Sequence, residues 1–309
     1  MRKRYGHGTV ASAEPSPAIR GALWLVTVAA TVALSGCIGL VPDLGHPQSV
    51  GQTSNGILRH GVSLPDSGEG FIRARPGEAT RFGTPTMVGA LTRAAASVAR
   101  RYPGGAPLRV GDIAYPAGGQ HPRHGSHRTG RDVDVIFYVR DITGRSVRGR
   151  GWLGFGRHGT VRETVTPGDG PPSNDLFFFD DARNWHFVRS LLADQEAAVQ
   201  WIFCARGVKA RLLEYARVHE PDPEIVFRAS WVLHQPGRGH PHHDHFHVRV
   251  ACTEEEQWSQ CQNTGPVWPW IRRAVEKRQF SPGMQLDDET LLRALLDDSS
   301  DEAELASAE

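Results

Sequence analysis

The chain has 309 residues and a formal net charge of +1. It has no basic stripe interleaved with aromatic residues, which argues against nucleic acid as a partner. Both ends differ in composition from the middle, so we expect one folded domain between two terminal segments of another kind.

The first 37 residues resemble a lipoprotein signal peptide. Basic residues at positions 2–4 and 20 precede a 13-residue apolar run at 22–34, which is too short to span a bilayer comfortably. The run ends in Leu34-Ser35-Gly36-Cys37, which resembles a bacterial lipobox. This resemblance implies cleavage before Cys37, a lipid on its sulfur, and a periplasmic location in the bacterial cell envelope, anchored to a membrane. The alternative is an ordinary signal or short anchor followed by a chance cysteine.

The segments on either side of the core show little regular spacing of apolar residues. Residues 38–75 are rich in Gly, Pro and Ser, so we expect a tether there. From Gln285 on, nine acidic side chains accompany one base, Arg293, and we expect an acidic C-terminal tail at 276–309. The folded domain is therefore expected at 76–275.

The core mixes helical and strand patterns without a regular βαβ rhythm. Thr84 and Pro85 are typical of a helix start, and the apolar residues from Met87 to Val98 share one helical face. Further helices are expected at 185–192 and 208–218, and strands at 132–139, 201–204, 231–233 and 245–250. We therefore expect an α+β fold in which helices flank a small antiparallel sheet.

The first polar stretch, HGSHRTGRDVD at residues 124–134, leads into an apolar strand. A turn at the Thr-Gly pair would let His127 and a strand aspartate point at one spot, and a strand is a rigid place for a ligand. Asp132 and Asp134 share a strand face, so spacing leaves both open.

The second polar stretch, HPHHDHFHVRV at residues 240–250, holds five of the fifteen histidines. Strict alternation puts His245, His247 and Arg249 on one face of the expected strand. One of the two imidazoles can therefore bind a metal while the other contacts a water bound to that metal.

Two imidazoles and one carboxylate are typical of a catalytic zinc site with a fourth position open for water. The ion lowers the pKa of that water to about 7 and polarises a carbonyl oxygen. A neutral histidine beside the water can then act as general base. The alternative is a histidine-rich loop that binds metal loosely or has no chemical role. The strand pattern of the HxH and the second His/Asp set upstream favour the zinc site.

The two stretches together resemble the penicillin-insensitive murein endopeptidases. These belong to a wider group of zinc peptidases with lysostaphin, the D-alanyl-D-alanine carboxypeptidases and the Hedgehog-like domains. The matching pieces are Ser126-His127-x-Thr129-Gly130-x-Asp132-Val133-Asp134 and His242-x-x-His245-x-His247-Val248-Arg249. The likeness covers about residues 60–262, so it extends well beyond a single motif.

The resemblance implies a ligand set for one catalytic Zn²⁺. His127, Asp134 and His247 match the family's ligands, which selects Asp134 over Asp132. Asp132 is then expected to orient a ligand or the turn. His124 matches a histidine at the edge of the site that is sometimes counted as a metal ligand.

The resemblance also implies catalytic roles. His245 matches the general base, and His242 matches a histidine that hydrogen-bonds the substrate or the oxyanion. The implied reaction is hydrolysis of D-alanyl–meso-diaminopimelyl crosslinks between peptidoglycan stem peptides. One rival is a carboxypeptidase or dipeptidase on the same fold, and another is a zinc-holding wall-binding module without turnover. Retention of both histidines argues against the module, because structural zinc sites usually fill all four positions with protein ligands.

The chain departs from some relatives in the middle of the domain. These relatives carry an Asp-x-x-His set associated with a further metal, whereas this chain has Asp180-Asp181-Ala182-Arg183. The arginine puts a second ion in doubt. Asp180, Arg183 and Asn184 could line the cleft, or an aspartate here could cap a helix.

The remaining cysteines and histidines have structural interpretations. Cys252 and Cys261 flank a polar loop and could pair in an oxidising envelope. Cys204 lies in an apolar run, so we expect a buried free thiol. The histidines expected at the surface are His121, His158, His186 and His219.

Overall fold

The structure is a computed structural model that describes residues 42–163, 174–237 and 239–272. The signal-peptide and acidic-tail predictions lie outside the described residues. The helices are α2 (Pro85–Arg101), α3 (Asp181–Ala193), α4 (Arg206–His219), α5 (Pro223–Val232) and α6 (Glu254–Trp258). The strands are β1 (Gln48–Gln52), β2 (Asn55–Arg59), β3 (Val62–Ser63), β4 (Ser67–Gly68), β5 (Phe71–Arg73), β6 (Phe82–Gly83), β7 (Leu108–Val110), β8 (Asp132–Ile136), β9 (Val139–Arg140), β10 (Ser146–Val147), β11 (Thr160–Arg162), β12 (Leu176–Phe179), β13 (Val199–Phe203), β14 (Leu233–His234) and β15 (His245–Val250).

The central sheet has seven strands in the order β14-β13-β15-β8-β7-β5-β4. It is larger than the predicted small sheet, and it is mixed, because β13 pairs with β14 in parallel and β5 with β7 in parallel. The three pairs at its centre, β13-β15, β15-β8 and β8-β7, are antiparallel. The α+β class is thus confirmed, while the size and the wholly antiparallel pairing were wrong.

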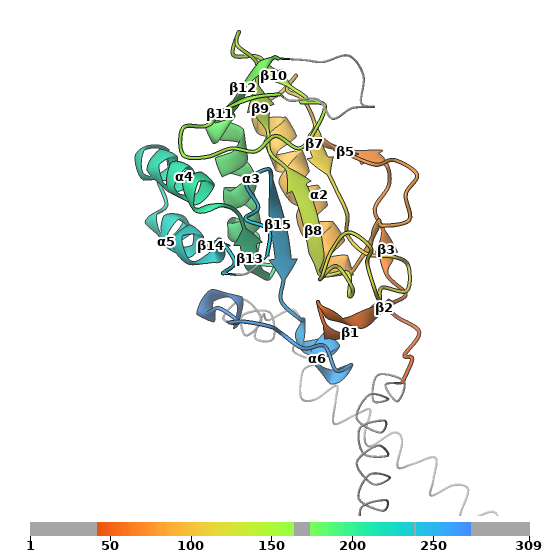
Figure 1. Cartoon of the computed structure of the whole chain (residues 1–309). Coiled ribbons are helices and arrows are strands. Elements are labelled where there is room, and N and C mark those ends of the chain that lie inside the picture. The colour runs from red at the N-terminus through yellow and green to blue at the C-terminus, as the bar shows by residue number, and fades with distance from the viewer. Residues whose placement is uncertain (1–41, 164–173, 238, 273–309) are drawn as a thin grey trace, which may run out of the picture. The chain divides into compact units, whose positions relative to one another are not determined.

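One face of the central sheet is buried against helices. Val133 and Val135 of β8 and Phe246 and Val248 of β15 belong to the hydrophobic core, together with the apolar face of α2. Figure 1 shows α2 and α3 behind β8 and β15. Because strand side chains alternate, this burial sends the polar residues of both strands to the opposite face.

The helix predictions are confirmed. Thr84 accepts a hydrogen bond from the Met87 backbone N–H and caps α2, with Pro85 at its first position. The helices predicted at 185–192 and 208–218 form within α3 and α4.

Two strand predictions need correction. The expected strand at 132–139 divides, because β8 ends at Ile136 and β9 pairs with β10 and β12 in a second sheet. Trp231 and Val232, expected in a strand, instead form the last turn of α5. That Trp-Val-Leu run is apolar enough for either structure, and the aspartate cap and proline at the start of α5 favour the helix.

The segment expected to be a tether is folded from the first strand on. Residues 48–73 form β1 to β5, and β5 extends the central sheet beside β7. The buried Arg131 side chain donates to Ser49 Oγ at 3.0 Å and to the Gln262 carbonyl at 2.9 Å, which ties β1 to the far end of the chain. The folded domain therefore begins well before residue 76.

The cysteine predictions are confirmed. Cys252 and Cys261 form a disulfide that closes the loop around α6. Cys204 is a free, buried thiol, and burial raises its pKa to about 12. No helix within the described residues combines the length and the apolar character needed to cross a bilayer.

Candidate metal centre

Four histidines surround the carboxylate of Asp134. Its Oδ1 lies 3.3 Å from His127 Nε2, 3.2 Å from His247 Nδ1 and 3.4 Å from His245 Nε2. Its Oδ2 lies 3.5 Å from His124 Nε2. His124, His127 and Asp134 offer ligand atoms that all lie within 4.8 Å of one another. The structure thus brings the four predicted ligands and the predicted base to one point.

The register of the central strands creates this convergence. β15 and β8 pair so that His247 stands directly opposite Asp134, and Arg249 stands opposite Asp132. His127 reaches the same point from the preceding loop, in the left-handed region at φ 65°. A non-glycine residue in this region costs on the order of 1–3 kcal/mol and persists only where the surroundings enforce it.

A hydrogen bond defines the tautomer of His127, whereas His247 lies between two carboxylates. His127 Nδ1 lies 2.8 Å from the Ile113 carbonyl, to which only an N–H can donate, so Nε2 carries the lone pair of the neutral ring. His247 Nε2 lies 3.2 Å from Asp132 Oδ1. A proton on that nitrogen leaves the lone pair of Nδ1 directed at Asp134.

In the middle of the cluster, the carboxylate oxygens of Asp134 face imidazole nitrogens that carry no proton when the rings are neutral. Both oxygens of Asp134 and the Nε2 atoms of His127 and His247 are buried without a normal hydrogen bond. Buried polar atoms without partners are rare and need an explanation. A cation among these lone pairs would satisfy all of them, and imidazole nitrogens with a carboxylate oxygen are ligands that Zn²⁺ accepts. The residues present fit a zinc ion.

Asp134 is held in its anionic form. Burial by itself raises the pKa of this carboxyl, but positive charge on protonated imidazoles, that of His127 first, and the contacts with His245 and His247 outweigh burial and hold the pKa well below its usual range; a cation at the same point would supply that charge to neutral imidazoles. A ligand carboxyl must be ionised to bind a metal, so this electrostatic environment suits the predicted role.

Asp132 supports the cluster from behind. It is fully buried and accepts two hydrogen bonds from Arg249, at 2.6 and 3.1 Å, besides its contact with His247. Its Oδ2 also accepts from the His127 backbone N–H at 3.3 Å. Asp132 thus orients two of the candidate ligands, in the way that outer carboxylates orient metal-binding histidines.

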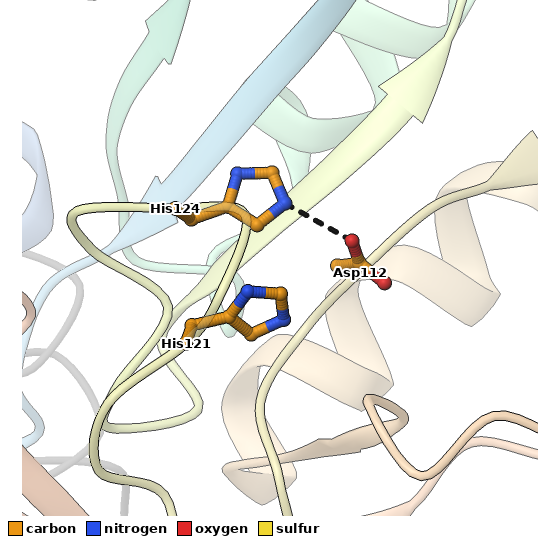
Figure 2. Close-up of side chains that lie close together, drawn as sticks. All are labelled: Asp112, His121 and His124. Carbon is orange, nitrogen blue, oxygen red and sulfur yellow. Dashed lines mark hydrogen bonds and ion pairs between the residues drawn. The ribbon is translucent and has the colours of Figure 1, made fainter.

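A second small cluster adjoins the first through His124. Figure 2 shows His124 Nε2 directed at Asp112, at 3.0 Å from Oδ2, with His121 beside it. The same nitrogen lies 3.5 Å from Asp134 Oδ2, so His124 Nε2 contacts two carboxylates. The prediction that His121 lies at the surface was wrong, because it is 4% exposed and its ring centroid lies 4.6 Å from that of His124.

Asp112 was missed by sequence reasoning. Thr80 donates to it at 2.6 Å, Arg123 donates to both of its oxygens, and Arg75 lies 3.2 Å away. Two guanidinium groups already neutralise this carboxylate, which makes it a support for His124 rather than an ionic ligand. Its only sequence signal is a lone aspartate after an apolar strand.

Part of the chain matches a known protein family. A family model described as penicillin-insensitive murein endopeptidase matches residues 49–159, a stretch that holds His124, His127 and Asp134. Over these residues the chain is similar to the penicillin-insensitive murein endopeptidases. It is therefore a peptidase. The match begins at residue 49, which agrees with a folded domain that includes β1.

Several proteins named penicillin-insensitive murein endopeptidase are similar to the chain. That of Haemophilus influenzae is 29% identical over 234 residues, which cover 72% of this chain and 69% of that protein. That of Yersinia enterocolitica is 28% identical over 258 residues, covering 79% and 82%. That of Klebsiella pneumoniae is 36% identical over 99 residues, covering 32% and 35%.

His245 has a carboxylate partner that the sequence did not predict. Asp244 Oδ1 lies 2.7 Å from His245 Nδ1, which leaves Nε2 facing Asp134. Burial lowers the pKa of His245, but Asp134 and Asp244 outweigh burial and raise it to about 9. Asp244 precedes the strand, so strand alternation does not assign it to a face.

His242 is close to both histidines of the HxH. Its ring centroid lies 5.0 Å from that of His245 and 5.3 Å from that of His247. Burial first, and then the neighbouring histidines, lower its pKa to about 3, so it is neutral at neutral pH. Its buried Nδ1 has no hydrogen-bond partner.

The segment that starts with Asp180 serves the fold. Asp180 accepts from the Arg183 backbone N–H at 3.2 Å and caps α3. The Arg183 guanidinium lies over the Tyr138 ring, 4.2 Å from its centroid, and donates to the Ala106 carbonyl at 2.6 Å. Asn184 exchanges hydrogen bonds with the Tyr138 backbone. Of the two interpretations left open by the sequence, the geometry favours the helix cap.

Proposed function

We propose that the chain is a zinc-dependent murein endopeptidase that hydrolyses the D-alanyl–meso-diaminopimelyl crosslinks of peptidoglycan. One observation carries the proposal: imidazole nitrogens of His127 and His247 lie 3.3 and 3.2 Å from the buried, ionised carboxylate of Asp134, in a chain whose relatives are named murein endopeptidases.

The proposed ligands are His127 Nε2, His247 Nδ1 and Asp134, with His124 Nε2 as an additional ligand at the edge. A bound Zn²⁺ supplies Lewis acidity toward a carbonyl oxygen and toward water. The protein side chains supply the proton transfers and hold the substrate. Asp132 and the Ile113 carbonyl keep the ligand imidazoles in the required tautomers.

His245 is the proposed general base. Its Nε2 faces the cluster and takes a proton from the attacking water, while Asp244 holds the proton on Nδ1. The water oxygen bonds to the carbonyl carbon, the carbon–nitrogen bond breaks, and His245 returns the proton to the departing amine. A cation on Asp134 would cancel one of the two negative charges that raise the pKa of His245, which brings the pKa closer to the neutral range where a general base is most effective.

His242 is the proposed oxyanion partner. As a neutral imidazole, it can donate one N–H to the oxygen that gains charge in the transition state. It stands beside both His245 and His247, so a carbonyl group at the cluster lies within its reach.

Digestion of crosslinked muropeptides by the purified protein tests the proposal. We expect dimers to disappear and monomers to accumulate, a chelator to stop the reaction, and Zn²⁺ to restore it. A β-lactam should have no effect, because no serine is acylated. Loss of terminal D-alanine with dimers intact would instead assign the chain as a carboxypeptidase, and a penicillin-sensitive, chelator-insensitive activity would contradict the mechanism.

The proposed location is the periplasmic side of a membrane, with a lipid on Cys37. The lipobox-like end of the apolar run supports this, and it lies outside the described residues. We expect Cys37→Ser to move the protein from the membrane fraction to the soluble fraction and to abolish incorporation of labelled fatty acid. Unchanged labelling in the variant would contradict the anchor.

A further inference from the structure

An aromatic pocket lies apart from the metal centre, between α5 and the last described residues. The pocket is open to solvent and is lined by Glu224, Phe227, Trp231, Trp268, Pro269 and Trp270. Phe227 is 51% exposed and Trp231 is 53% exposed. Large aromatic side chains gathered at a surface indicate a binding site more often than chance exposure. Figure 1 shows the end of the described chain, in blue, beneath α5.

The walls of this pocket are held in place. Trp268 Nε1 donates to the Gln200 carbonyl at 2.7 Å, which fixes its indole to β13. Trp270 stacks on Trp268, with ring centroids 5.2 Å apart and planes 9° apart. The Arg228 guanidinium lies 5.7 Å from the centroid of Trp270. Flat aromatic faces are therefore presented to a ligand at low cost in side-chain entropy.

A track of rings joins the pocket to the metal centre along β13. The ring centroids of His247 and Phe203 are 5.4 Å apart, those of Phe203 and Trp201 are 5.8 Å apart, and those of Trp201 and Trp268 are 5.3 Å apart. Trp231 follows Trp268 at 6.0 Å. A substrate that extends beyond the scissile bond could follow this track from the centre to the pocket.

The lining favours a sugar over other apolar ligands. The six lining residues include no Leu, Ile, Val or Met, the side chains that usually cover lipid or apolar helices. Flat indole faces match the C–H faces of a pyranose ring, and Glu224, which lines the pocket and lies 3.0 Å from Arg228 Nε, offers an acceptor to hydroxyl and amide groups. Since Arg228 already neutralises Glu224, the pocket does not favour a cation.

We propose that this pocket binds the glycan strand of peptidoglycan through its N-acetylated amino-sugar rings, while the crosslink peptide occupies the metal centre. The proposal rests on the proposed function for its choice of polymer. The pocket would raise the local concentration of crosslinks at the metal centre, as a second linked binding site does.

Titration of the full-length protein with soluble N-acetylglucosamine tetramer tests the proposal. Loss of one stacked aromatic face is expected to weaken binding about tenfold, so Trp231→Ala and Phe227→Ala should each raise Kd by about that factor. Trp258→Ala is the matched control, because Trp258 is 85% exposed on α6 and does not line the pocket. Its Kd should stay within about twofold of the wild-type value. Both pocket positions are about half exposed, so the variants should fold, and circular dichroism melting curves would show this.

Hydrolysis separates this proposal from the proposed function. With Trp231→Ala, we expect kcat/KM on intact sacculi to fall about tenfold, mainly through KM, and kcat/KM on sugar-free crosslinked peptide dimers to stay unchanged. If no crosslink is cleaved but the tetramer binds and Trp231→Ala weakens that binding, the proposed function fails and the sugar site stands. No tetramer binding by the wild type, or equal effects of Trp231→Ala and Trp258→Ala, would overturn the sugar site. So would a dimer in sedimentation that Trp231→Ala dissociates, because a second copy of the chain would then be the occupant.

Discussion

Replacing His247 by alanine is expected to remove the metal and reduce hydrolysis to background. His247 Nδ1 lies 3.2 Å from Asp134 and stands opposite it in the sheet, so no other side chain can take its position without moving a strand. Loss of an outer carboxylate usually costs about 10–100-fold in metal affinity. Loss of a direct ligand should exceed this, and zinc per protein after dialysis should fall close to zero.

Two further variants make this measurement specific. Asp132→Asn keeps every direct ligand but weakens the support of His247, so we expect an intermediate loss of affinity of about 10–100-fold. His240→Ala changes an exposed histidine of the same histidine-rich run, and its zinc content should match that of the wild type. Full zinc content in His247→Ala would show that the metal binds elsewhere.

Replacing His245 by alanine is expected to preserve the metal and to lower kcat by about 10²–10⁴-fold, the usual contribution of a general base. Asp244 Oδ1 lies 2.7 Å from His245 Nδ1, which leaves Nε2 as the nitrogen that faces the cluster. Zinc content and kcat should be measured on the same preparation. Loss of zinc would instead make His245 a ligand, which its 3.4 Å distance to Asp134 permits.

A substitution of Asp244 tests the same general base with a smaller expected effect. Asp244→Asn keeps an oxygen near His245 Nδ1 but removes the charge that makes the imidazole more basic. We therefore expect a smaller loss of kcat, about tenfold, and an acidic limb of the pH–rate profile displaced to lower pH. An unchanged profile would show that Asp244 does not act through His245.

The periodic elements were predictable because their signals are local. The cap at Thr84 and the apolar face that follows it gave α2, and the alternation from His245 to Val250 gave β15. The segment at 48–73 was misassigned because its strands are short and their partners are distant: β5 pairs with β7, and Arg131 ties β1 to Gln262. Strands of five residues or fewer that are stabilised by pairing with distant segments show no clear alternation of apolar and polar residues in their own sequence.

The sequence alone was enough to identify the kinds of side chain at the site. A His-x-x-His run before an Asp-x-Asp strand, and an HxH on another strand, carry zinc chemistry in their composition and spacing, and their likeness to a family selected Asp134. Strand alternation placed Asp132 and Asp134 on one face and could go no further, because it describes one strand at a time.

Only the tertiary structure separated the two aspartates by a physical criterion. The register of β15 on β8 sets His247 opposite Asp134 and Arg249 opposite Asp132, so one carboxylate meets lone pairs and the other meets a guanidinium. The same packing brought Asp112 and Asp244 to His124 and His245. Such contacts depend on how strands and loops far apart in the chain align, and that alignment is decided by burial of the opposite face against α2 and α3.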